Sequence, residues 1–161
     1  MLQFITSPCG KLPQARQAAM AVEGGCAWIE LAPGEELEKT ASELVELFKG
    51  EDIFLMVPDD VDLVDRLRVH GVVLSTADPK TVAETREKLG AHAVIGVRVA
   101  SAAEAAAIRA VDIDYIIYGV PAGKDEALGA WSGFRSELDA AGVPFHAVAS
   151  GSFDPETAAA L

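Results

Sequence analysis

Short apolar or alternating runs recur along the whole chain, separated by stretches in which apolar residues have helical spacing. We predict seven strands, at Leu2–Thr6, Ala27–Ala32, Ile53–Val57, Gly71–Ser75, Ala93–Val99, Asp114–Gly119 and Pro144–Ala149. Successive strands begin about 24 residues apart on average, whereas hairpins carry turn signals every ~8 to 12 residues. This spacing favours repeated strand–helix units, so the sheet is expected to be parallel.

The segments between the strands carry helix signals. Pro13–Gly25 begins with proline in its first turn and stops at a glycine pair, and Glu35–Gly50 places apolar residues on one face. Ser101 and Glu104 have the spacing of a capping box at the head of an alanine-rich helix. Asp154 and the proline after it predict the start of one more helix, with aspartate as N-cap.

Two architectures fit alternating strands and helices: an open doubly wound sheet and a closed (β/α)8 barrel. The open sheet predicts a glycine-rich phosphate loop after the first strand, and Thr6–Gly10 is not one. The barrel predicts an eighth strand, but eight units of this length need roughly 190 residues and the chain has 161. The pattern favours a single domain over residues 1–161, a parallel barrel with seven units evident and the eighth strand missing.

Composition narrows the class of protein. The chain is 50% hydrophobic and has 13 Lys and Arg against 25 Asp and Glu, for a formal charge of −12. Such an acidic chain is a poor partner for nucleic acid, because that binding depends on neutralising phosphates. No apolar run approaches the ~18 residues of a membrane span, and two cysteines do not make a disulfide framework. We therefore expect a cytoplasmic protein without a membrane or nucleic-acid partner, in which a metal ion mediates binding of any phosphorylated substrate.

Polar residues that follow the strands are the candidates for chemistry, because parallel α/β folds place their sites at the carboxyl ends of strands. Asp59 and Asp78 come just after neighbouring predicted strands. Two such carboxylates suit Mg²⁺, which takes one or two carboxylates together with water and substrate phosphate. The alternative is helix capping by Asp59 or Asp60 and by Asp78, which precedes a proline. The spacing leaves both roles open.

Five segments of the chain, in order, are Leu2–Thr6, Glu23–Leu31, Asp59 through Leu74, Ile95–Val97 and Asp114–Ile116. In this order, over essentially the whole chain, they resemble the thiamine phosphate synthase / thiazole tautomerase family. The resemblance implies a TIM-type barrel. It also implies an enzyme that couples a pyrimidine pyrophosphate to a thiazole phosphate, with Mg²⁺ holding the leaving pyrophosphate. The family's two magnesium aspartates fall on Asp59 and Asp78.

Other family positions differ here. Glu30 replaces an amide and the arginine that follows it in the family is absent; Arg98 stands where the family has serine, and Ala100 where it has histidine. Only Lys124 matches the lysine that grips pyrophosphate, and Ser150-Gly151 replaces a Gly-Gly phosphate turn. The predicted site is therefore Asp59 and Asp78 for the metal, Arg98 and Lys124 as catalytic cations, and Glu30, Ser150 and Gly151 for substrate or phosphate.

These departures leave two main hypotheses, and a further enzyme class, an epimerase or decarboxylase on the same barrel, stays open because this fold hosts many chemistries. The first is a synthase of thiamin biosynthesis that uses Mg²⁺, with a partly degraded site and small phosphorylated heterocycles as substrates. The second is a family member without synthase activity, either a binder of thiazole or phosphate or a non-catalytic partner of a true synthase. A missing eighth strand would leave the first and seventh strands with open edges, which a homo-oligomer is one way to cover.

Overall fold

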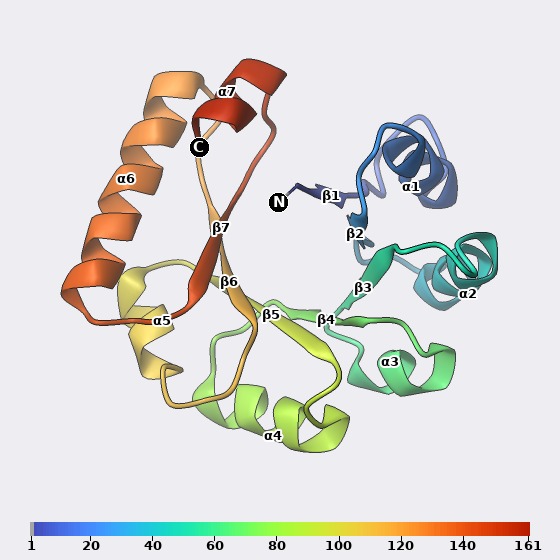
Figure 1. The fold of residues 1–161 in the computed structure, drawn as a ribbon, viewed down its shortest axis with the longest axis horizontal. Helices are drawn as coiled ribbons and strands as arrows, with labels where there is room; N and C mark the ends of the chain where they lie inside the picture. The colour runs from blue at the N-terminus through green and yellow to red at the C-terminus, as the bar shows by residue number, and fades with distance from the viewer. Residues whose placement is uncertain (1) are drawn as a thin grey trace. The chain divides into compact units, whose positions relative to one another are not determined.

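The computed structural model describes residues 2–161, in which seven strands alternate with seven helices (Figure 1). The strands are β1 (Gln3–Ile5), β2 (Trp28–Glu30), β3 (Phe54–Pro58), β4 (Gly71–Leu74), β5 (Val94–Val99), β6 (Tyr115–Gly119) and β7 (His146–Ser150). The helices are α1 (Gln14–Glu23), α2 (Leu37–Leu47), α3 (Val61–Leu67), α4 (Pro79–Leu89), α5 (Ala102–Ala107), α6 (Lys124–Ala140) and α7 (Pro155–Ala160). All seven predicted strands are confirmed, and their ends differ by at most two residues.

The chain divides into two compact units. One contains the residues up to Val73 together with Leu89–Val94, and the other contains Leu74–Lys88 together with Ile95–Leu161. In the first unit β1, β2, β3 and β4 pair in chain order, and in the second β5, β6 and β7 do the same. Every one of these pairs is parallel, so the predicted parallel pairing is confirmed within each unit.

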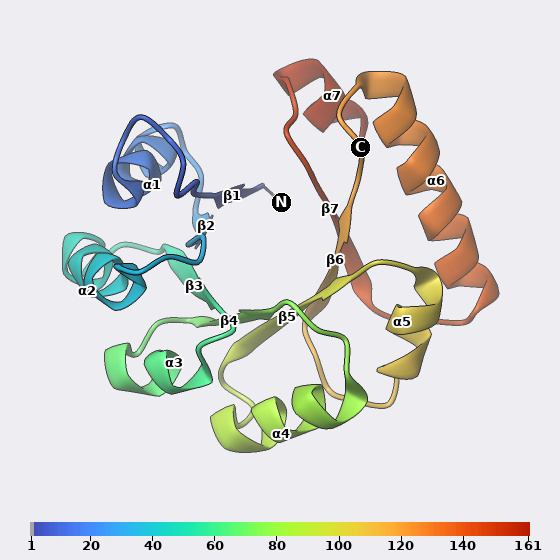
Figure 2. The same cartoon turned by 180° about the vertical axis from the view of Figure 1, so that it is seen from behind.

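Helices cover one side of the strands in each unit. Figures 1 and 2 show α1, α2 and α3 beside the strands of the first unit, and α5 and α6 beside β5, β6 and β7. Residues Leu55–Pro58 of β3 and all of β4 are buried without alternation. Such continuous burial is typical of parallel strands that are packed on both faces, and it explains why these segments have near-continuous apolar sequences.

The helix starts follow the sequence signals. The Ser101 hydroxyl accepts a hydrogen bond from the backbone N–H of Glu104 at 3.3 Å, as the capping box predicts. The Asp154 carboxylate accepts one from the N–H of Thr157 at 2.7 Å, so Asp154 is the N-cap of α7. At the head of α3 the cap is Asp60, whose carboxylate accepts from the N–H of Leu63 at 2.9 Å.

Within residues 2–161, no helix combines the length and the apolar character that crossing a bilayer requires. Cys9 is an exposed free thiol and Cys26 a buried one.

His70 makes the first unit sensitive to pH. Its Nδ1 accepts a hydrogen bond from the backbone N–H of Leu55 at 3.1 Å, a bond that requires the neutral ring. Burial lowers the pKa of His70 below its ordinary value of 6.5, and the nearby Asp52 carboxylate offsets this only in part. Because the unfolded chain then binds the proton more tightly than the folded chain does, neutral His70 contributes to the stability of the folded protein. This stabilisation is fully present above about pH 6.5 and is lost as pH falls through the lowered pKa.

We expect the free energy of unfolding, measured with urea, to fall between pH 7.5 and pH 5. The decrease should be smaller in His70→Gln, which removes the titrating ring, and should persist in His92→Gln, which leaves the His70–Leu55 hydrogen bond in place. An equal decrease in His70→Gln and the wild type would show that His70 is not its source.

Candidate functional site

A hollow of about 520 Å³ lies at the carboxyl ends of strands in the second unit. It is lined by Ser75, Arg98, Val99, Ala100, Glu104, Tyr118 and Gly119, which follow or end β4, β5 and β6 or begin α5. This is the edge of a parallel sheet at which α/β proteins place their ligands. The hollow is therefore the candidate site.

Another hollow, of about 420 Å³, lies in the first unit beside β1 and α1. No charged residue lines it: Leu2, Phe4, Leu12, Met20, Ala21, Gly24 and Cys26 surround it, with Gln3 and Gln17 as its polar members. A surface of this composition has no cation to match a phosphate, unlike the hollow of the second unit.

Arg98 brings a cation to the candidate site. It is half-buried near the end of β5, where it is paired with Ile117 of β6, and the next residue, Val99, is paired with Tyr118. Because successive side chains of a strand point to opposite faces, Arg98 lies on one face of the sheet and Val99 and Tyr118 on the other. The residues that line the hollow therefore come from both faces of the sheet: the cationic Arg98 from one face, and Val99 and Tyr118 from the other.

Glu104 brings a carboxylate to the same hollow. Its Oε2 accepts a hydrogen bond from the backbone N–H of Ala100 at 2.8 Å, at the start of α5. The sequence identified Glu104 only as a capping residue and did not predict its place in the site. A capping box that directly follows a strand lies at the carboxyl edge of the sheet, because the helix begins where the strand ends. This position is the sequence signal that could have identified Glu104 as a site residue.

Tyr118 is the aromatic residue of the hollow. Its ring stacks on that of Phe134 from α6, with centroids 4.0 Å apart and planes 4° from parallel. Phe134 is buried, so the stack fixes the tyrosine from the helix side. The sequence placed Tyr118 at a strand end without assigning it a role.

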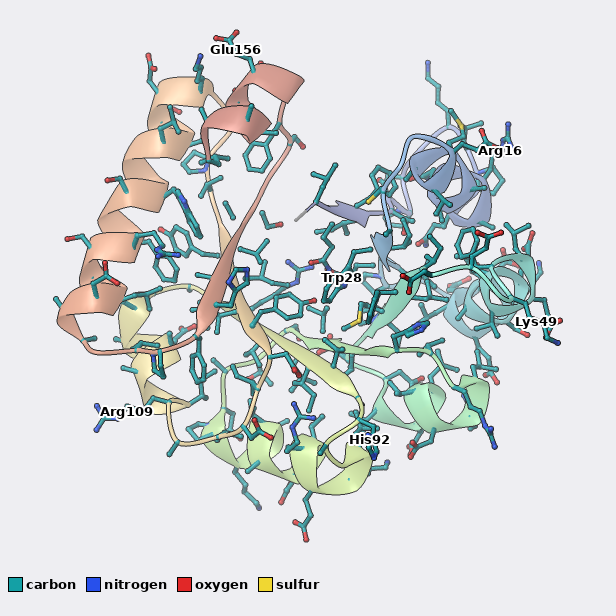
Figure 3. All side chains as sticks on the ribbon, in the orientation of Figure 1. Arg16, Trp28, Lys49, His92, Arg109 and Glu156 are labelled. Atoms are coloured by element: carbon teal, nitrogen blue, oxygen red, sulfur yellow. The ribbon has the colours of Figure 1, made fainter. Side chains whose placement is uncertain are left out.

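Other predicted residues of the second unit lie outside this hollow. Lys124 begins α6 and forms an ion pair with Glu156 of α7, which Figure 3 labels. Ser150 ends β7 and accepts a hydrogen bond from the N–H of Val120 at 2.9 Å through its backbone oxygen. A Cβ on Gly151 would lie 2.8 Å from the ring of Phe153, so this turn has no room for a side chain.

Asp78 caps α4. Its Oδ2 accepts hydrogen bonds from the N–H of Thr81 at 2.8 Å and from the hydroxyl of Thr81 at 2.7 Å. These bonds lower the pKa of Asp78, so the carboxylate is held in its charged form. The capping role that the sequence left open is therefore present. The other carboxylate oxygen of Asp78, Oδ1, accepts neither of these two bonds.

Asp59 belongs to the first unit and follows β3. Its backbone φ is 51°, in the left-handed region that few residues other than glycine adopt. Its N–H donates to the backbone oxygen of Val73 at 3.0 Å. The neighbouring Asp60, and not Asp59, caps α3, which settles one of the alternatives that the sequence left open.

Glu30 lies at the end of β2 in the first unit and is buried. Its Oε2 accepts a hydrogen bond from the side-chain amide of Gln3 at 2.9 Å. Nearby, the buried Thr6 hydroxyl accepts from the N–H of Ala32 at 2.8 Å. The carboxylate is thus held within the strand layer by a side chain of β1.

No group of three or more His, Cys, Asp or Glu side chains suited to a metal ion occurs within residues 2–161. Of the predicted site residues, Arg98 lines the hollow, whereas Asp78, Lys124, Ser150 and Gly151 lie elsewhere in the same unit. Asp59 and Glu30 belong to the first unit.

Comparison with solved structures supports the fold class. A thiamine phosphate pyrophosphorylase from Pyrococcus furiosus aligns with a TM-score of 0.75 at 26% identity, over 97% of this chain and 77% of its own. The citrate synthase SbnG aligns with a TM-score of 0.65 at 14% identity, over 98% of this chain and 80% of its own, a likeness of fold alone. The predicted parallel barrel of the TIM type is thereby confirmed as the fold class.

Sequence relatives agree with this likeness. The thiamine-phosphate synthase of Bacteroides thetaiotaomicron is 39% identical over 99 residues, 59% of this chain and 47% of the relative. That of Bacteroides fragilis is 39% identical over 99 residues, 59% of this chain and 48% of the relative. The match thus spans about half the length of these curated relatives. The family model described as thiamine monophosphate synthase matches residues 2–161, and the chain therefore belongs to this family.

Proposed function

We propose that this protein is a thiamine-phosphate synthase of thiamin biosynthesis, which couples a pyrimidine pyrophosphate to a thiazole phosphate. The observation that carries the proposal is the hollow at the carboxyl ends of β5 and β6, which Arg98 lines. Membership of the thiamine monophosphate synthase family supports the reaction class. The relatives named thiamine-phosphate synthase support it as well.

Arg98 is proposed to bind the anionic group of the substrate. A guanidinium is always charged and presents several N–H donors that match phosphate oxygens. In a half-buried position such a contact is stronger than in water, and it counts most where charge accumulates on the leaving pyrophosphate. We assign Arg98 the role of holding that charge while the new carbon–nitrogen bond forms.

Lys124 is proposed as a second cation for pyrophosphate. Its present partner, Glu156, is largely exposed, so their ion pair is weak and a multiply charged ligand can compete for the lysine. Ser150 and Gly151 are proposed to offer the backbone of their turn to a phosphate, and Glu30 to orient substrate from the end of β2. These assignments rest on the family positions that the residues occupy.

We propose Mg²⁺ as the cofactor, with Asp59 and Asp78 as its protein ligands. The donor chemistry fits, because carboxylate oxygens are hard ligands and the lowered pKa of Asp78 keeps its group charged. Such an ion would supply positive charge to the departing pyrophosphate. We also propose a cytoplasmic location, where free thiols such as Cys9 and Cys26 are usual.

The test is an assay of thiamine phosphate formation from the two precursors with Mg²⁺, in the wild type and in Arg98→Met. The variant should lose about 10²-fold or more in kcat/KM, as when a charge-stabilising group is removed from an active site. Arg109→Met is the matched control, because Arg109 is exposed just after α5 and points away from the strands (Figure 3). Absence of product with the wild type, or equal rates for wild type and Arg98→Met, would reject the proposal.

A further inference from the structure

Tyr118 is the residue of the hollow whose surroundings imply a role that the sequence did not assign. It lies near the end of β6 on the same sheet face as Val99, whereas Arg98 lies on the other face. Both residues nevertheless line the hollow. A ligand that fills the hollow therefore meets Arg98 and Tyr118 at different parts of its own structure.

The phenol ring is held rigidly. Phe134 covers one of its faces with nearly parallel planes, and Trp131 packs against Phe134 with centroids 6.0 Å apart. Trp131 is in turn covered by the Arg135 guanidinium, 5.8 Å from its ring. This stack along α6 means that Tyr118 loses little conformational freedom when a ligand binds, so a contact with it contributes most of its energy to affinity.

The Tyr118 hydroxyl is available to a ligand. Within the described residues the side chain of Tyr118 makes the ring stack with Phe134, and its hydroxyl makes no hydrogen bond to protein. The neighbouring charge on the hollow is the Glu104 carboxylate, which repels phosphate oxygens. An anionic group of a ligand is therefore drawn to Arg98, and a heterocycle is left for the side of Tyr118.

We infer that Tyr118 is a specificity-determining residue, whose hydroxyl donates a hydrogen bond to an acceptor atom of the substrate heterocycle while Phe134 fixes its ring. This inference rests on the proposed function and adds to it the residue that reads the heterocycle rather than the phosphate. Phe134 has no place on the hollow itself. It acts through Tyr118 as a positioning residue.

Calorimetric titration with two ligands tests the inference. Thiamine phosphate carries both a heterocycle and a phosphate, whereas inorganic pyrophosphate carries only the anion. Tyr118→Phe should weaken thiamine phosphate about 3- to 10-fold, the value of one hydrogen bond, and leave pyrophosphate within about 2-fold, since no contact with the anion is removed. Arg98→Met should weaken pyrophosphate, the anion that Arg98 is proposed to hold. The melting temperature of Tyr118→Phe should match the wild type, because the ring stack is retained.

Phe134→Leu separates positioning from simple loss of packing. It should weaken thiamine phosphate in the wild-type background and have little effect in the Tyr118→Phe background, because only the hydroxyl needs to be positioned. Unchanged binding of thiamine phosphate by Tyr118→Phe, or an equal loss for both ligands, would overturn the inference. If the wild type makes no thiamine phosphate yet Tyr118→Phe lowers its affinity, the proposed function fails and the contact stands. If the wild type binds neither ligand, both are rejected.

Discussion

Gly71→Ala should destabilise the protein by about 3 kcal/mol or more, at the upper end of what overpacking a core costs. A Cβ on Gly71 would lie 1.9 Å from the backbone oxygen of Val94 and 2.9 Å from the Met56 side chain. Because the first of these contacts is with backbone, a side-chain rotation cannot relieve it. Gly71 is paired with Met56 in the sheet, and the N–H of Val94 donates to the oxygen of His70 at 3.0 Å, so the strand has little freedom to retreat.

Gly133→Ala is the matched control for this substitution. Gly133 lies inside α6 and is exposed, and a Cβ there would meet no side chain or neighbouring element of residues 2–161 within 4 Å. Alanine there should stabilise the protein by about 0.5 to 1 kcal/mol, because glycine is a poor helix former. Urea unfolding followed by circular dichroism measures both variants. A Gly71→Ala variant within about 1 kcal/mol of the wild type would contradict the close approach, given the usual cost of overpacking.

The period of the apolar runs was enough to predict the strands and their parallel pairing. Spacings near two dozen residues leave room for a helix between strands, and β3 and β4 are buried on both faces as their apolar sequences indicate. The same pattern says nothing about how closely backbones approach. Gly71 was predicted only as the first residue of a strand, whereas its contact with Val94 depends on a segment more than twenty residues away.

The site was predicted less completely than the fold. Arg98 was found because it lies near the end of a strand and carries charge, and the structure places it on the hollow. Glu104 was interpreted as a capping residue, since its spacing from Ser101 accounts for it fully without a ligand. Tyr118 has no local motif at all: its role depends on Phe134, which a helix brings from elsewhere in the chain. The spacing of residues along the chain does not predict a role that depends on such distant neighbours.

Asp114→Ala is expected to produce the second large loss of stability, about 2 to 3 kcal/mol. Asp114 Oδ2 accepts hydrogen bonds from Arg86 Nη2 and from the backbone N–H of Ile95, both at 2.8 Å. Arg86 also donates from Nε to the backbone oxygen of Asp112 at 2.7 Å, and its side chain is only 14% exposed. Removal of the carboxylate would leave a mostly buried guanidinium and a strand amide without this shared acceptor, which is costlier than losing a surface ion pair.

Asp114→Asn separates charge from hydrogen bonding at this position, and Glu36→Ala is a control for the loss of a surface ion pair. Asp114→Asn keeps an oxygen acceptor for the Ile95 amide and removes the charge, so it should fall between the wild type and Asp114→Ala. Glu36→Ala breaks the exposed pair with Lys39, whose side chains are 72% and 73% exposed, and should leave stability close to that of the wild type. Urea unfolding at pH 7 measures all three. Equal stability of Asp114→Ala and Glu36→Ala would show that the strand amide and Arg86 find other partners, and that this network does not hold β5 and α4 together.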